Sequence, residues 1–258
     1  KMNLWSMNPT EIRALLRNGQ HRKESTGYWA AGYKQANLAI VPSKLAKDFE
    51  KFALANSGAL PLLYVSKVGE LTAGDWGKNS DIRTDAPAYQ IYKPLTKKCY
   101  TVSDVDCSDM VTFYIGCSYS FSRILIENKL LTPNSKGVSM FRTNIDCYGS
   151  GPFQCKMIVS MKAISKTGLS KIHQITSKFS DVHGAPIHYG NPARIGIPDV
   201  NDYIGDPTDF LENDVPVFWC CGFTAVEALM QANVERAFTH WPNSVFITDV
   251  KQEDISLE

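Results

Sequence analysis

Two stretches of the chain pass from a continuous apolar run to apolar residues at helical spacing. In residues 111–125 the run Val-Thr-Phe-Tyr-Ile ends at Gly116, small polar residues follow, and apolar residues then recur three or four apart. Residues 215–229 repeat this design. A short apolar run is typical of a buried strand, and spacings of three and four are typical of a helix. Each stretch therefore predicts a strand, a tight turn and a helix.

The two stretches place equivalent residues at their turns. Aligned with each other, Cys117 corresponds to Cys221, and Ser120 corresponds to Thr224. Each unit brings a thiol, a small polar residue and a helix N-terminus to one place, where α/β proteins usually bind ligands. We expect the helix dipole to lower the pKa of these thiols. The alternatives are buried, unreactive thiols, or turns whose backbone N–H groups bind an anion.

Strands and helices alternate along the rest of the chain. Strands are predicted at 38–41, 62–65, 89–92 and 245–250, and helices at 8–20 and 43–56. This alternation predicts an α/β fold whose mostly parallel sheet has helices on both faces.

One segment has a different character. Residues 138–145 and 154–161 alternate like two paired strands, followed by helical spacing over 165–179 and a short strand at 186–189. This order predicts a smaller inserted α+β lobe over residues 136–190. Residues 1–135 and 191–258 would then form the main α/β domain.

Composition excludes several classes of function. The 258 residues carry a net charge of +1, so no strong field attracts nucleic acid or a membrane surface. No apolar run approaches the length of a membrane span. The seven cysteines show no paired C-x-x-C spacing, which indicates a reduced intracellular protein without a zinc site. We expect no metal and no cofactor. A homo-oligomer is compatible with the sequence.

Two segments contain arginines that could bind carboxylates. In Asp81-Ile82-Arg83-Thr84-Asp85, an aspartate could fix Arg83 for this purpose, and a solvated loop is the alternative. In Phe141-Arg142-Thr143-Asn144, a charge and an amide interrupt an otherwise apolar strand and need partners. A clamp on a substrate carboxylate would supply them, and so would an internal salt bridge.

Histidines and one strand start provide the remaining candidates. His183 and His188 lie five residues apart in a Gly/Pro loop, and a third metal ligand is missing nearby. General acid/base catalysis by one of them fits better. Two loop histidines bonded to backbone are the alternative. Gln35 brings a polar side chain to the start of a strand, where it could orient a substrate or cap a loop.

Taken together, these segments resemble the D-glutamate cyclase family, also described as hydro-lyases. The resemblance rests on Gly32-Tyr33-Lys34-Gln35-Ala36-Asn37-Leu38, Asp81-Ile82-Arg83-Thr84-Asp85-Ala86-Pro87, Gly116-Cys117-Ser118-Tyr119-Ser120-Phe121, Phe141-Arg142-Thr143-Asn144-Ile145, Gln174-Ile175-Thr176-Ser177, His183-Gly184-Ala185-Pro186-Ile187-His188 and Val215-Pro216-Val217-Phe218-Trp219. The chain departs from the family pattern at Ser122, where the family commonly has a glutamate, and at Ala31, where it commonly has a proline.

The resemblance implies a two-lobed α/β fold and conversion of D-glutamate to 5-oxo-D-proline with loss of water. An intracellular location follows, cytoplasmic for a bacterial protein and mitochondrial for an animal homologue. We expect His183 to act as the base and the turn after Gly116 to stabilise the oxyanion. The expected catalytic residues are His183, Cys117 and Asp81, and the expected substrate-binding residues are Arg83, Arg142, Thr143, Asn144, Gln35, Ser118, His188 and Thr224.

Two other functions stay open. The first is an amino-acid racemase in which two thiols flank the substrate Cα. The second is a non-catalytic amino-acid-binding module. The serine at 122 is compatible with it, because the glutamate that is common in the family at this position could be a catalytic acid or base.

Overall fold

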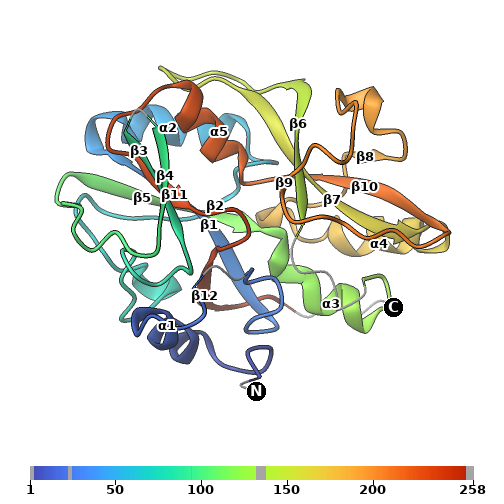
Figure 1. The fold of residues 1–258 in the computed structure, drawn as a ribbon, viewed down its shortest axis with the longest axis horizontal. Helices are drawn as coiled ribbons and strands as arrows, with labels where there is room; N and C mark the ends of the chain where they lie inside the picture. Colours follow the sequence, from blue (N-terminus) through green and yellow to red (C-terminus); the bar gives the residue numbers. More distant parts are fainter. Residues whose placement is uncertain (1–2, 23–24, 94, 132–137, 254–258) are drawn as a thin grey trace.

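The chain folds around two β-sheets that lie side by side (Figure 1). The computed structural model describes residues 3–22, 25–93, 95–131 and 138–253. Five α-helices and two antiparallel sheets make up this part of the chain, which confirms a mixed α/β protein.

The first sheet has seven strands. They are β1 (Tyr33–Pro42), β2 (Leu62–Val65), β3 (Tyr89–Lys93), β4 (Leu95–Cys99), β5 (Met110–Cys117), β11 (Phe238–His240) and β12 (Phe246–Lys251). Their order is β2-β5-β1-β11-β3-β4, and β12 also pairs with β1. The strands β1 and β5 therefore lie inside the sheet.

The second sheet has five strands. They are β6 (Ser139–Asp146), β7 (Lys156–Ser165), β8 (His188–Tyr189), β9 (Ile204–Gly205) and β10 (Asp214–Cys220), in the order β8-β10-β7-β6-β9. It thus takes strands from both sides of residue 190. The division of the chain into an inserted lobe and a main domain stays a prediction.

The prediction that the sheet is mostly parallel is wrong. Every strand pair in the described part of the chain is antiparallel. The sequence was misleading because all eight residues of β5 are buried, and strands buried on both faces read as continuous apolar runs, as parallel strands do. Here an antiparallel sheet is covered on both sides.

The helices are short, with between 6 and 13 residues each. They are α1 (Pro9–Arg17), α2 (Ser43–Ala55), α3 (Ser122–Glu127), α4 (Leu169–Thr176) and α5 (Thr224–Gln231), and the 3-10 turns are η1 (Gly74–Trp76), η2 (Ser118–Phe121), η3 (Lys166–Gly168), η4 (Ser180–Val182) and η5 (Pro192–Ile195). The start of α1 is a capping box between Asn8 and Glu11, with Pro9 in the first turn. No helix in the described ranges is long and apolar enough to cross a membrane.

Both predicted strand-turn-helix units are confirmed. The first is β5, η2 and α3, and the second is β10, a turn and α5. Their turns have the same hydrogen bond: Ser120 Oγ donates to Cys117 O at 2.7 Å, and Thr224 Oγ1 donates to Cys221 O at 2.7 Å. The alignment made on sequence alone therefore corresponds to a repeated local structure.

Each hydroxyl also joins its turn to the neighbouring strand. Ser120 Oγ accepts a hydrogen bond from Gln35 N on β1 at 2.9 Å, and Thr224 Oγ1 accepts one from Ile158 N on β7 at 3.0 Å. The strand register agrees, because Gln35 lies opposite Cys117. Both turns are thus fixed to a central strand of their own sheet.

A shared apolar core joins the two sheets. It contains Phe49 and Phe52 of α2, Phe113 of β5 and Ile158 of β7, all fully buried, together with Phe153 from the loop after β6. The ring centroids of Phe49 and Phe153 lie 5.2 Å apart. Burial of such large side chains contributes about 1.5–3 kcal/mol each. This core holds the two turns close to each other.

Candidate functional site

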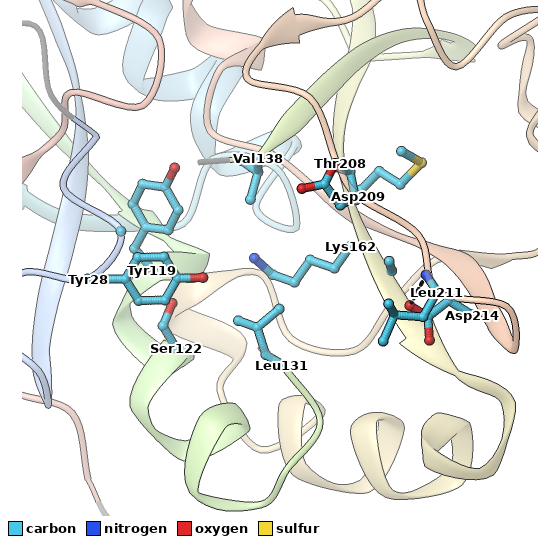
Figure 2. Close-up of a pocket in the computed structure, with 13 residues that line it drawn as sticks. Tyr28, Tyr119, Ser122, Leu131, Val138, Lys162, Thr208, Asp209, Leu211 and Asp214 are labelled. Atoms are coloured by element: carbon cyan, nitrogen blue, oxygen red, sulfur yellow. Dashed lines mark hydrogen bonds between the residues drawn. The ribbon is translucent and has the colours of Figure 1, made fainter. Parts of the chain in front are cut away.

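A cavity of about 230 Å³ lies between the first turn and the second sheet (Figure 2). Its wall combines side chains from near the N-terminus, from the first turn and from the second sheet. The lining residues are Gly27, Tyr28, Tyr119, Ser122, Leu131, Val138, Met161, Lys162, Ala163, Thr208, Asp209, Leu211 and Asp214. A cavity of this size suits a small molecule such as an amino acid.

Lys162 is the cationic side chain of this wall. It leaves the middle of β7, and Figure 2 shows its amine pointing towards Tyr119 and Ser122. Its Nζ lies 5.9 Å from the centroid of the Tyr119 ring. The residue is only 3% exposed, and no carboxylate in the described part of the chain pairs with it. A lysine buried in this way is unusual and needs a reason.

Burial lowers the pKa of Lys162 to about 8, although Cys117 and Cys221 act in the opposite direction. Desolvation penalises the charged ammonium, and no anionic side chain among the described residues compensates for it. Near pH 8, Lys162 is therefore a neutral amine in a large fraction of the molecules. A neutral amine at a cavity wall can act as a general base or as a nucleophile.

The two turn cysteines lie beside this amine. Burial raises the pKa of Cys117 to about 11 and that of Cys221 to about 12. The expected lowering of the thiol pKa is therefore wrong. A backbone N–H of each turn does bond to the sulfur, that of Tyr119 to Cys117 and that of Phe223 to Cys221. These bonds favour the thiolate, but burial outweighs them, so both groups are thiols at neutral pH.

His183 is also buried close to Lys162. Its backbone is left-handed, with φ of 90°, and its Nδ1 lies 3.0 Å from Gly58 O. Burial and, to a smaller extent, the nearby Lys162 lower the pKa of His183 to about 4. The ring is consequently neutral at physiological pH and bonded to backbone. Its expected role as the catalytic base stays a prediction.

Gly116 allows the His183 loop to reach the first turn. A Cβ on Gly116 would lie 1.9 Å from the carbonyl oxygen of Asp181, closer than any real contact. Asn37 stabilises the same turn, because its Nδ2 donates to Gly116 O at 3.1 Å. The arrangement of Cys117 and His183 therefore depends on the missing side chain at residue 116.

The structure brings together some of the residues expected at the site and leaves others apart. Gln35, Ser118 and Thr224 are buried at or next to the two turns. Gln35 Nε2 donates to Thr26 O and Trp29 O, while its Oε1 is buried without a partner. These contacts position loops, and roles in substrate binding stay predictions.

Asp81 and Arg83 form their own ion pair away from the cavity wall. Arg83 donates from Nε and Nη2 to the two carboxylate oxygens of Asp81, at 3.0 and 2.7 Å. Asp85 in the same segment pairs with Arg17 of α1. An aspartate does fix Arg83, as the sequence predicted, but neither residue lines the cavity.

The residues of the arginine strand also lie outside this cavity. Arg142 Nε donates to Glu227 Oε1 at 2.9 Å, so the internal salt bridge considered as an alternative is present. Thr143 Oγ1 donates to Met157 O at 2.7 Å, which joins β6 to β7. Asn144 is exposed on the same strand.

His188 differs from His183 in its surroundings. Its Nε2 lies 2.8 Å from Asn191 O, and its ring lies 5.8 Å from that of Phe218. It does not line the cavity. Within the described residues, no group of three His, Cys, Asp or Glu side chains is placed to hold a metal ion.

Sequence reasoning missed Lys162 and Tyr119. A signal for Lys162 was present, because this lysine lies inside the apolar run Met157–Ile164, where a charge needs an explanation. Ser122 was noticed as a departure from the family pattern, and the structure places it on the cavity wall that faces Lys162. A glutamate at residue 122 would bring a carboxylate towards the amine.

Comparison with known proteins shows which family the chain is similar to. A family model described as D-glutamate cyclase matches residues 111–249. A protein of Rhizobium johnstonii named "Putative hydro-lyase" is 43% identical, over 94% of this chain and 92% of its own length. Relatives with the same description from Staphylococcus haemolyticus and Bacillus subtilis are 40% and 38% identical, over 99% and 97% of this chain and 100% of their own lengths.

One solved structure, a nitrogen repressor-like protein from Methanococcus jannaschii, covers 95% of this chain and 98% of its own at 11% identity. Its TM-score of 0.41 is too low to carry an argument. The sequence relatives are far more similar and match almost end to end. On these matches, the chain belongs to the D-glutamate cyclase family.

Proposed function

We propose that the protein is a lyase that removes water from an amino acid, and that its reaction is the cyclisation of D-glutamate to 5-oxo-D-proline. Membership of the family and the names of the relatives support the reaction class. The observation that carries the proposal is Lys162, a buried amine at the wall of a small cavity, with a pKa of about 8 and no carboxylate partner in the described residues.

The reaction needs one group that can take a proton and return it. The α-ammonium of the substrate must lose a proton before its nitrogen can attack the γ-carboxyl carbon. The neutral Lys162 amine accepts that proton and becomes an ammonium. As the C–N bond forms and the C–O bond breaks, the nitrogen loses a second proton. This proton and the one already on Lys162 leave with the departing oxygen as water. Lys162 transfers these protons and ends neutral, so that charge and atoms balance.

The cavity contributes geometry as well as chemistry. Glutamate is flexible, and ring closure requires its amine and γ-carboxyl group to be held in contact, which a small enclosed space enforces. Positive charge on Lys162 would also stabilise the oxyanion that develops on the attacked carbon. The Tyr28 and Ser122 side chains are nearby hydrogen-bonding groups on the opposite wall.

A racemase is the second candidate, because Cys117 and Cys221 come from equivalent turns and both interact with Lys162. Two thiols on opposite sides of a Cα could remove and return its proton. Burial disfavours this function, since it raises the pKa of Cys117 to about 11 and that of Cys221 to about 12 and leaves few thiolates at neutral pH.

Mass spectrometry in deuterated water separates these functions. We expect D-glutamate to lose the mass of water and to keep its Cα–H. Deuterium at Cα without loss of water would instead support the racemase. Thermal stabilisation by D-glutamate or 5-oxoproline without any turnover would support a binding module, and a lack of both binding and turnover would reject glutamate as the substrate.

The rate should depend on pH through Lys162. Only the neutral amine is a base, so kcat/KM should rise with pH and level off above about 8, where the amine is mostly deprotonated. Ser122→Glu places a carboxylate opposite Lys162, favours its ammonium and should move this rise to higher pH by at least about one unit. At pH 7 the variant should be on the order of tenfold slower.

The matched control is Ser177→Glu, which adds the same charge at an exposed position after α4. Its pH profile should coincide with that of the wild type. An unchanged profile for Ser122→Glu would mean that Lys162 does not set the pH dependence.

A further inference from the structure

A second cavity, larger than the first, lies on the other side of Tyr119. Its volume is about 690 Å³, and it is lined by Ser25, Gln90, Arg142, Ile204, Gly205, Asp206, Phe223, Met230, Trp241, Pro242 and Asn243. None of these residues lines the Lys162 cavity. The proposed reaction therefore leaves this second cavity without a function.

A hydrogen-bonded partition separates the two cavities. Tyr119 lines the first, and its hydroxyl donates to Asn243 Oδ1 at 2.8 Å. The Asn243 Nδ2 in turn donates to Asp206 Oδ2 at 2.7 Å, and Ser25 Oγ lies 3.2 Å from the tyrosine hydroxyl. Asn243, Asp206 and Ser25 all line the second cavity. A ligand there would thus contact a different set of groups from one beside Lys162.

Arg142 is the cationic side chain of the second cavity. Glu227 holds it by one bond, from Nε to Oε1, and Glu227 is itself buried and bonded by Gln231 Nε2 at 3.0 Å. Among the described residues, no other hydrogen bond is made by the Arg142 guanidinium, whose side chain is 55% exposed. Its two Nη groups are therefore oriented by the ion pair but available. A planar pair of N–H donors of this kind matches a carboxylate.

The rest of the wall combines aromatic and aliphatic side chains with several polar groups. Phe223 is a buried aromatic residue just before α5. Trp241 and Pro242 follow β11 in the chain and line the same cavity. Ile204 and Met230 add aliphatic surface, and Met230 is 41% exposed. Gln90, only 7% exposed, adds an amide. Pockets of this kind bind small molecules through an apolar body and a few placed polar groups.

We propose that this second cavity binds a small organic acid with a flat apolar body, its carboxylate on the Nη groups of Arg142 and its body against Phe223 and Trp241. The site differs from the one proposed for the reaction, both in position and in its ligand. D-glutamate has no apolar body, and no arginine is among the described residues that line the Lys162 cavity.

Calorimetric titration with benzoate tests the proposal, with benzamide as a neutral ligand of the same shape. We expect the wild-type protein to bind benzoate, and to bind benzamide at least tenfold more weakly. Arg142→Met should weaken benzoate binding at least tenfold. Arg142→Lys, which keeps the charge next to Glu227 but loses the planar donor pair, should also weaken it and guards against misfolding of the methionine variant.

Two further variants locate the ligand. Lys162→Met alters the first cavity and should leave the benzoate Kd unchanged, as should Arg194→Met, which removes an exposed arginine elsewhere. Failure of the wild-type protein to bind benzoate, wild-type affinity in both Arg142 variants, or loss of binding in Lys162→Met would each overturn the proposal. None of these measurements requires turnover, so they stand apart from the test of the proposed reaction.

Discussion

Lys162→Met is expected to lower turnover by about 10²–10⁴-fold while the protein stays folded. Methionine has a similar length and no proton to transfer, so the proposed base is lost without a large change in volume. Removing an unpaired, buried amine also removes a desolvation cost. The melting temperature should therefore stay the same or rise, and circular dichroism with thermal melting can establish this before rates are compared.

Lys156→Met provides the matched control. Lys156 lies on the same strand, six residues earlier, but its side chain is 48% exposed and pairs with Asp146. The same substitution there should leave kcat/KM within about twofold of the wild type. The lost ion pair is exposed, and such pairs contribute little to the stability of the fold. A near-wild-type rate in Lys162→Met would remove Lys162 from the mechanism and leave His183 as the next base to test.

Gly116→Ala is expected to reduce the free energy of unfolding by about 3 kcal/mol or more. The added Cβ would meet the Asp181 carbonyl oxygen at 1.9 Å, and that atom belongs to backbone and cannot rotate away. Overpacking of this kind usually costs about 1–3 kcal/mol, and backbone contacts fall at the upper end. For a chain of this size, the melting temperature should fall by roughly 6–12 °C.

Gly58→Ala is the control for this effect. A Cβ on Gly58 would have Cys220 Sγ as its nearest neighbour at 3.6 Å, which is ordinary contact, so the change should stay within about 1 kcal/mol. Thermal and urea unfolding of both variants can be compared directly. Equal stability of the two would show that the Asp181 loop moves aside at little cost, and that the turn is less tightly packed than the geometry indicates.

Local structure was largely readable from the sequence. The change of apolar period in residues 111–125 and 215–229 correctly predicted two strand-turn-helix units, because side-chain period follows directly from backbone geometry. The equivalence of Ser120 and Thr224 was also correct, since each hydroxyl makes the same bond three residues back. Such contacts depend on neighbours along the chain, which a single sequence displays.

Strand direction was not readable in the same way. The buried run in β5 predicted a parallel sheet, yet β5 pairs with β1 and β2 in antiparallel fashion. An apolar run reports burial on both faces and carries no information about the direction of the neighbouring strand. The partners of the two arginines show the same difference. The partner of Arg83 is an aspartate of its own segment, as the sequence predicted, but Glu227, the partner of Arg142, was identified only by the fold.

By itself, the sequence determined the two thiol-bearing turns and the resemblance to the D-glutamate cyclase family. Tertiary structure alone placed the buried Lys162 amine at the cavity wall, with the two turn cysteines and His183 buried nearby. This placement sets their pKa values, because a pKa depends on desolvation and on the charges nearby in space. Burial brings the pKa of Lys162 to about 8, while it raises those of Cys117 and Cys221 out of the useful range.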